Sequence, residues 1–140
     1  MKDGLKVGVE HTLKFTVTRE KTVPFLYPEA KNFQEMPEVF ATGFMVGFME
    51  WACMEALQPY LDDDERSVGT MINVSHEAAT PAGMEVTATV RCIEAEGKKS
   101  TWEIEARDEV DVIGRGTHGR FVINVDKFAQ RLNAKAARKA

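Results

Sequence analysis

The chain has 140 residues, of which 44% are hydrophobic and 29% are charged, and its formal net charge at pH 7 is −4. The length predicts one domain over residues 1–140, and the acidic balance argues against a nucleic-acid-binding protein, which would normally be basic. The N-terminal residues carry no apolar run and the longest apolar stretch is too short to cross a bilayer, so we expect a cytoplasmic protein without a signal peptide or a membrane partner.

The first predicted elements are a strand and a long irregular segment. Residues 12–18 alternate apolar and polar side chains, which predicts a half-buried strand. Residues 19–37 contain three prolines, which exclude regular strand pairing, and yet the segment is rich in apolar side chains. Such a segment either plugs the open end of a core or forms a lid over a ligand pocket, and the sequence leaves both interpretations open.

Residues 38–60 form the predicted central helix. Its side chains are apolar on almost every side, which is typical of a helix that is buried all round. Glu50 lies in the middle of this apolar stretch, and a buried carboxylate needs a partner or a chemical role. Gly43 and Gly47 lie on the same side as Glu50 and leave the backbone open to a strand, a subunit or a ligand. Thr42 stands near the predicted start, where a hydroxyl commonly caps a helix.

Four further strands are predicted after this helix, and the last is followed by a short amphipathic helix with a basic end. The side chains expected to face the core are Val68, Thr70, Ile72, Val74 and His76 in the first of these strands, Val86, Ala88, Val90 and Cys92 in the second, Trp102, Ile104 and Ala106 in the third, and Phe121, Ile123 and Val125 in the fourth. Arg120 then falls on the opposite face of the fourth strand.

Two clusters of potential ligand atoms do not predict a metal site. Residues 62–65 are all acidic, but four adjacent carboxylates cannot all turn toward one ion, so this run predicts a solvated turn. Cys53 and Cys92 lie in apolar surroundings without zinc-ligand spacing, which predicts reduced core thiols. We therefore expect no bound metal.

The order of these elements predicts an α+β protein with the hotdog fold. In that fold about five antiparallel strands wrap around one long buried helix, and here a short C-terminal helix follows. The helix-grip fold is the alternative, but its long helix usually comes last and is amphipathic. A sheet of this kind has an exposed edge, and side-by-side pairing of two copies would cover it, so we expect a homodimer.

Several long motifs of the chain match a known family. They are PEVFATGFMVGFMEWAC from Pro37, VGT from Val68 followed by His76, AATPAGMEV from Ala78 and GRGTHGRFVI from Gly114. In these motifs, and without gaps over nearly its whole length, the sequence closely resembles the fluoroacetyl-CoA-specific thioesterase family. The resemblance implies the hotdog fold and a thioester hydrolase that converts a small acyl-CoA, such as a fluoroacetyl-CoA-like substrate, to the free acid and CoA.

The resemblance also implies roles for particular residues. In the family, a threonine at the helix start, a glutamate within the helix and a histidine on the following strand form the catalytic set, which corresponds to Thr42, Glu50 and His76. The implied substrate contacts are Gly69 and Arg120, which hold the acyl end and the carbonyl, and an apolar lid of Val23, Leu26, Phe33 and Met36.

Met36 departs from the family pattern. The fluoroacetyl-specific enzyme has a phenylalanine at this lid position, and that aromatic gate is associated with its discrimination for fluorine. Methionine is flexible and lacks the quadrupole of an aromatic ring. The change puts selectivity for fluoroacetyl groups in doubt and leaves thioester hydrolysis intact.

The chemistry of thioester hydrolysis fits these residues. The reaction needs an activated water or a nucleophile, a base, and donors for the developing oxyanion. Glu50 can act as the base, with a raised pKa if it is desolvated, or attack the carbonyl itself, and the sequence does not separate these roles. His76 can polarise a water or protonate the leaving thiolate, and backbone N–H groups near Gly43 can hold the oxyanion.

Thr42 can orient a water or pair with Glu50, but the two residues are eight positions apart, which is about 12 Å along an ideal helix. They can meet only around a substrate, through an unwound first turn, or across a dimer.

Each candidate also has a plainer interpretation. Thr42 alone is typical of a helix cap, His76 of a strand end that faces a partner, and Arg120 of a solvated strand. Gly43 can serve close packing only, and Glu50 can be a structural partner of an arginine or a histidine. The candidates gain weight because they match one catalytic pattern together.

Two alternatives to a thioesterase exist on this fold. A non-catalytic acyl-CoA-binding protein on this fold would keep the pocket and lack turnover, and the intact Thr42, Glu50 and His76 count against it. A hydratase on this fold would carry a signature that is missing here. Hydrolysis needs no cofactor, because CoA is part of the substrate. Lys127 and Arg131 are candidates for contacts with the CoA phosphates, although a solvated tail explains both.

Overall fold

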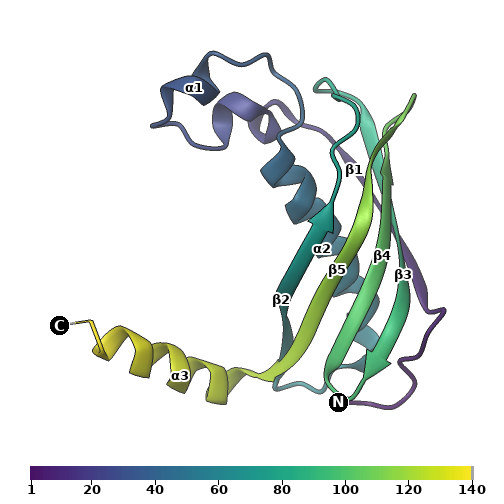
Figure 1. Cartoon of the computed structure of the whole chain (residues 1–140), viewed down its shortest axis with the longest axis vertical. Helices are drawn as coiled ribbons and strands as arrows, with labels where there is room; N and C mark the ends of the chain where they lie inside the picture. Colours follow the sequence, from purple (N-terminus) through teal and green to yellow (C-terminus); the bar gives the residue numbers. More distant parts are fainter. Residues whose placement is uncertain (140) are drawn as a thin grey trace.

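The computed structural model of the protein describes residues 1–139 and contains a sheet of five strands with one long helix, α2, along its face (Figure 1). The strands are β1 (Glu10–Thr16), β2 (Glu65–Val74), β3 (Glu85–Glu96), β4 (Lys99–Arg107) and β5 (Val112–Asn124). The helices are α1 (Lys31–Gln34), α2 (Thr42–Leu57) and α3 (Val125–Ala137). This is the α+β hotdog arrangement that the order of elements predicts.

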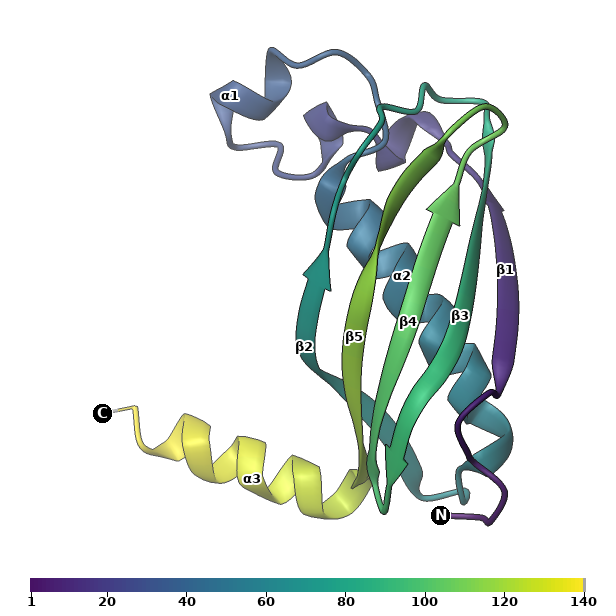
Figure 2. The ribbon, with the colours of Figure 1, turned by 45° about the vertical axis from the view of Figure 1, so that its right-hand side comes forward.

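The strands are antiparallel and lie in the order β1-β3-β4-β5-β2 (Figure 2). The strand that follows α2 therefore pairs with the last strand of the chain, and β1 and β2 form the two edges. Within residues 1–139 no strand pairs with the outer edge of β2. Its free backbone groups are a surface on which a further strand can be added.

The inward faces of β3 and β4 are as predicted from their alternation. Val86, Ala88, Val90, Cys92, Trp102, Ile104 and Ala106 are all buried and belong to the same core as α2. The Trp102 Nε1–H group donates to Ser100 Oγ at 2.9 Å, so the polar atom of this ring has a partner inside the core. Cys53 and Cys92 are buried free thiols, as predicted, and burial raises the pKa of Cys53 to about 12.

The predicted facing of β5 is wrong. Phe121 is 41% exposed, whereas Val122 and Arg120 are buried. The ladder explains this result, because His118 lies opposite Trp102 of β4, and residues directly opposite each other share a face of the sheet. Arg120 shares this inward face because acceptors for its guanidinium are available there, which an alternation of apolar side chains does not reveal.

The predicted facing of β2 is partly wrong. Val68 lies opposite Phe121 and shares its outward face, whereas Ile72 lies opposite His118 on the inner face. The parity changes because the register of β2 against β5 shifts between Gly69 and Met71, as at a β-bulge. Ile72 is nevertheless 44% exposed, since β2 is an edge strand.

Helix α2 is buried on one side only, which corrects the expectation of burial all round. Its buried residues are Met45, Phe48, Met49, Ala52, Cys53, Ala56 and Leu57. The opposite side exposes Trp51 and Met54 together with Gly43 and Gly47, because the sheet covers a single face of the helix. The helix begins at Thr42, and a 3₁₀ turn over Gln58–Tyr60 follows its end.

The segment 19–37 is more regular than predicted. It contains 3₁₀ turns over Arg19–Lys21 and Val23–Phe25 and the short helix α1, and it lies at the N-terminal end of α2 (Figure 1). Leu26 contacts the first turn of α2, because a Cβ atom placed on Gly43 would lie 3.0 Å from Leu26 Cδ2. The ring centroids of Tyr27 and Phe33 are 5.9 Å apart within the segment. Proline excludes strands here but is compatible with these short turns.

The acidic run and the C-terminal helix complete the fold. Asp62, Asp63 and Asp64 are exposed as expected, but Glu65 is buried, because β2 begins with this residue and its Oε1 accepts the Asp62 N–H group at 2.9 Å. Helix α3 contains no buried residue and extends away from the sheet, with Lys127 and Arg131 exposed (Figure 1). Within residues 1–139, no helix is both long enough and apolar enough to cross a membrane.

Candidate functional site

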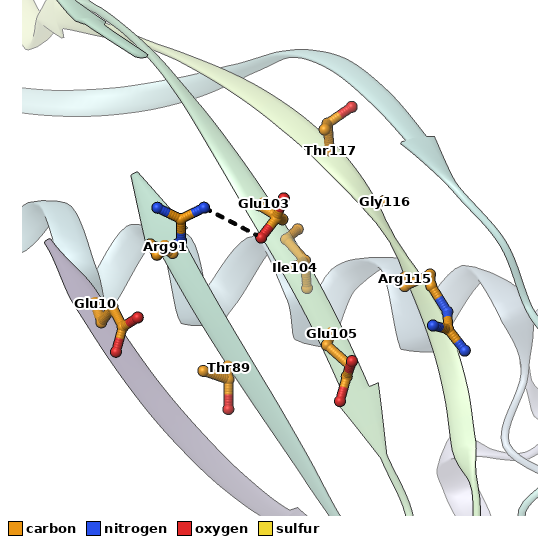
Figure 3. Close-up of a pocket in the computed structure, with 9 residues that line it drawn as sticks. All are labelled: Glu10, Thr89, Arg91, Glu103, Ile104, Glu105, Arg115, Gly116 and Thr117. Carbon is orange, nitrogen blue, oxygen red and sulfur yellow. Dashed lines mark hydrogen bonds and ion pairs between the residues drawn. The ribbon is translucent and has the colours of Figure 1, made fainter. Parts of the chain in front are cut away.

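A cavity of about 510 Å³ lies on the outer face of the sheet, away from α2 (Figure 3). Charged side chains from neighbouring strands line it, and two of the lining arginines form ion pairs. Arg91 Nη2 lies 3.5 Å from Glu103 Oε1, and Arg115 Nε lies 2.9 Å from Glu77 Oε2. Because both ion pairs are exposed to solvent, we interpret this cavity as the solvated face of the sheet.

The first group of predicted site residues meets at the N-terminus of α2. Thr42 is the first residue of the helix, and its Oγ1 lies 2.7 Å from Nδ1 of His76, in the segment that follows β2. The expected capping role of Thr42 is wrong, because Ala41 occupies the N-cap position without a side-chain hydrogen bond. The threonine hydroxyl forms a hydrogen bond with the His76 ring instead.

The His76 imidazole is partly buried and has one unused nitrogen. Burial lowers its pKa below the ordinary value of 6.5, and the backbone of Ala78 opposes this effect only in part. Its Nε2 atom is buried and has no hydrogen-bond partner within residues 1–139. A buried polar atom without a partner is rare in folded proteins, so such an atom is a natural contact for a substrate or a water molecule.

The second group surrounds Glu50 in the middle of α2. Glu50 Oε2 accepts a hydrogen bond from Arg120 Nη1 at 2.9 Å, and it lies 4.0 Å from Nε2 of His118. Arg120 is 2% exposed, whereas the Glu50 side chain is 41% exposed. The expectation that Glu50 is desolvated is therefore wrong, because its side chain is partly exposed. The guanidinium of Arg120 forms a charge-assisted hydrogen bond with its carboxylate.

Gly69 lies directly against this second group. A Cβ atom at position 69 would lie 2.9 Å from Glu50 Oε2, 3.2 Å from His118 Cε1 and 3.4 Å from Arg120 Nη1. A residue with a Cβ atom at this position would displace the Glu50 carboxylate, since real Cβ atoms almost never approach another atom within 3.0 Å. The sequence associates Gly69 with the acyl end of the substrate, and the structure adds that it makes room for the carboxylate.

A cavity of about 370 Å³ opens beside this group, at the free edge of β2. The residues that line it are Val46, Glu50, Gly69, Thr70, Met71, Ile72 and His118. The carboxylate of Glu50 and the ring of His118 are its titratable groups. It is therefore the cavity in which a polar reaction next to Glu50 can take place.

The structure brings the predicted residues together in two groups. Thr42 and His76 form one, and Glu50, Gly69 and Arg120 form the other. Because α2 is helical from Thr42 onward, an unwound first turn does not join the groups, which remain about 12 Å apart along the helix. Backbone N–H groups of the first turn, including that of Gly43, lie in the Thr42 group and have no acceptor within the helix.

The lid candidates lie beyond the Thr42 group. Leu26 packs on α2 at Gly43, and Val23 and Phe33 are partly buried. Met36 follows α1 and is 47% exposed. Of the four, only Leu26 is placed in contact with the first turn of α2 by the Gly43 geometry.

His118 is the site residue that the sequence analysis missed. It is buried, and its ring lies between Met71 of β2 and Arg120. A signal was present, because His118 and Arg120 are two positions apart and share a face of the same strand. Because Phe121 was predicted to face the core, His118 was not recognised as an inward-facing residue of β5.

Known proteins match this chain over most of its length. The sequence matches the fluoroacetyl-CoA-specific thioesterase family, FlK, over residues 17–126. It is 53% identical over 135 residues to a fluoroacetyl-CoA thioesterase of Streptantibioticus cattleyicolor, with 96% of this chain and 97% of that protein covered. The solved structure of the fluoroacetyl-CoA thioesterase FlK matches with a TM-score of 0.90 and 52% identity, and 99% of each chain is covered. A thioesterase superfamily member from Thermus thermophilus matches with a TM-score of 0.84 and 27% identity over 96% of each chain.

Proposed function

The chain belongs to the fluoroacetyl-CoA-specific thioesterase family, and on this premise we propose that it hydrolyses short acyl-CoA thioesters, including fluoroacetyl-CoA, to the free acid and CoA. The observation that carries the proposal is the Glu50 carboxylate, which Arg120 holds through one oxygen at the wall of an open cavity. Within residues 1–139 its second oxygen, Oε1, has no hydrogen-bond partner and is available for the reaction.

In the proposed reaction, Glu50 supplies the attack on the thioester carbonyl, either through its own oxygen or through a water that it deprotonates. A C–O bond forms and the C–S bond breaks, and where Glu50 itself attacks, a water then hydrolyses the acyl–Glu50 anhydride, which releases the free acid and restores the carboxylate. The first-turn N–H groups of α2 stabilise the oxyanion. Thr42 donates a hydrogen bond to Nδ1 of His76, so Nε2 carries the ring N–H group and can donate a hydrogen bond to the developing charge on the sulfur. The proton that Glu50 takes from the water passes to the departing thiolate. The reaction uses no cofactor besides the CoA of the substrate.

We propose that the active enzyme is a homodimer and that each site contains residues of both subunits. The edge of β2 is free, and Met71 and Ile72 are large apolar residues exposed on this strand. Pairing of two β2 strands about a twofold axis would extend the sheet and cover them. It would also bring the Thr42–His76 pair of one subunit toward Glu50 of the partner, which removes the separation of the two groups within one chain.

A mixed dimer tests this arrangement. The variants Thr42→Ala and Glu50→Gln are expected to be inactive alone, but a purified heterodimer of the two should regain about half of the wild-type activity per dimer. One of its sites then combines an intact Thr42 with an intact Glu50. A heterodimer as inactive as both parents would place each complete site within a single subunit, and a monomeric wild type would overturn the dimer.

The release of CoA from a panel of short acyl-CoAs tests the proposed function itself. We expect turnover of acetyl-CoA and fluoroacetyl-CoA, with a smaller preference for fluorine than a phenylalanine at the Met36 position would give. Because aromatic contacts contribute about 0.5–1.5 kcal/mol, Met36→Phe should raise the fluoroacetyl preference roughly 2- to 10-fold. Binding of acyl-CoA without release from any substrate would instead identify a non-catalytic binding protein.

A cytoplasmic location completes the proposal. CoA thioesters are intracellular compounds, and both cysteines are free thiols, as expected in a reducing compartment.

A further inference from the structure

We propose that His118 is a positioning residue for catalysis. The unprotonated Nε2 atom of its neutral imidazole holds Arg120 in place, and Arg120 in turn holds the Glu50 carboxylate. The inference rests on the proposed thioesterase function, because it assigns His118 a role relative to Glu50. His118 itself lies at the wall of the cavity, and the proposal does not require it to touch the substrate.

Two contacts determine where the proton of His118 lies. Nδ1 is 2.8 Å from the backbone oxygen of Met71, and a carbonyl oxygen can only accept a hydrogen bond. Nδ1 must therefore carry a proton. Nε2 lies 3.1 Å from Arg120 Nη1, and a guanidinium can only donate. Nε2 must therefore be bare, and the imidazole is the neutral Nδ1–H tautomer.

The bare nitrogen accepts the second hydrogen of Arg120 Nη1. Its Nε donates to Ser67 Oγ at 3.0 Å, and its Nη2 donates to the Ser67 backbone oxygen at 2.7 Å. Nη1 carries two hydrogens, and one is donated to Glu50 and the other to His118. Because contacts on both sides hold the planar guanidinium, Arg120 presents a fixed hydrogen to Glu50 Oε2.

Protonation of His118 would break this arrangement. An imidazolium would place an N–H group against the Nη1 hydrogens of Arg120, and two positive charges would lie together in a buried site. The charged groups that face the ring are Arg120 on its own strand and Glu50 on α2, while β2 and β4 contribute Met71 and Trp102. Burial lowers the pKa of His118, and Arg120 lowers it further, while the Met71 contact and the Glu50 charge oppose these effects. The neutral form is thus favoured at pH 7.

The tautomer can be observed directly. The chain contains three histidines, so ¹⁵N-edited NMR of the imidazole rings gives few signals, and His118→Gln identifies the one that belongs to His118. At pH 7 we expect a protonated Nδ1 and an unprotonated Nε2 for this ring. An Nε2–H tautomer or an imidazolium at pH 7 would overturn the proposal. This readout is independent of turnover, so it holds whatever the substrate of the enzyme.

Matched substitutions test the positioning role. His118→Leu removes the acceptor, and we expect kcat to fall about 10- to 100-fold with little change in KM, because a misplaced catalytic group slows the chemical step. His118→Gln has an amide oxygen within reach of Arg120 Nη1, and we expect it to recover much of that loss. His11→Gln is the control, because His11 lies on β1 and pairs with Glu55 at 2.8 Å, outside both groups of the site.

The outcomes separate this inference from the proposed function. Equal kcat values for the Leu and Gln variants would show that His118 only fills space, and an unchanged kcat in the Leu variant would remove any role. If the Leu variant does not fold, the Gln variant and the tautomer measurement still test the positioning role of His118. A wild-type protein that hydrolyses no acyl-CoA would refute the proposed function, whereas an active wild type with an unaffected Leu variant would refute the inference alone.

Discussion

Replacing Glu50 with glutamine is expected to lower kcat for acyl-CoA hydrolysis by about 10²- to 10⁴-fold, the usual contribution of a positioned catalytic acid or base. The substitution keeps the shape of the side chain and an oxygen that can accept from Arg120. It removes the negative charge, and with it both the basicity and the nucleophilicity that the reaction needs. CoA release under saturating substrate measures the loss.

The control for this variant lies on the same helix. Glu55 is also a partly exposed glutamate of α2, but it pairs with His11 and not with the site. Glu55→Gln should keep wild-type kcat and KM. An active Glu50→Gln enzyme would remove Glu50 from the chemistry and leave its contact with Arg120 as a structural ion pair.

The alternation of apolar and polar residues correctly predicted the inward-facing side chains in those strands where apolar packing alone determines the facing. In β3 and β4, Val86 to Cys92 and Trp102 to Ala106 alternate with polar residues, and the core contains all of the predicted positions. The same reasoning failed in β5, where Phe121 and Val122 are adjacent and both apolar. There the choice of face depends on Arg120, whose buried position is stable only because Glu50, Ser67 and His118 accept its hydrogens.

Motif resemblance predicted the site residues, but the contacts between them could be found only in the structure. A mid-helix glutamate pointed to Glu50, and nothing in the spacing of the sequence paired it with a residue 70 positions later. The hydroxyl of Thr42 looked like a cap because the residue starts a helix, and its partner lies on a segment 34 positions away. Local patterns report local hydrogen bonds, whereas these contacts depend on how β2 and β5 cross α2.

Thr42 and His76 are expected to act as one unit, so their loss should not be additive. Thr42→Val removes the hydroxyl with little change in shape, and His76→Ala removes the ring. Each should lower kcat by about 10²-fold, because each breaks the same 2.7 Å contact, and the double variant should be little worse than the poorer single variant. Thr42→Ser keeps the hydroxyl and should retain most of the activity. Losses that multiply in the double variant would assign the two residues separate roles.

The pH dependence gives the same pair a second signature. Burial lowers the pKa of His76, so the ring stays neutral at pH 7 and accepts a proton only under more acidic conditions. Once protonated, Nδ1 can no longer accept the Thr42 hydrogen, and kcat should fall as the pH drops through that lowered pKa. The His76→Ala variant should lose this step in its residual kcat profile. A residual profile identical to that of the wild type would show that His76 does not control the acid side of the reaction, and Thr42 would then act through its hydroxyl alone.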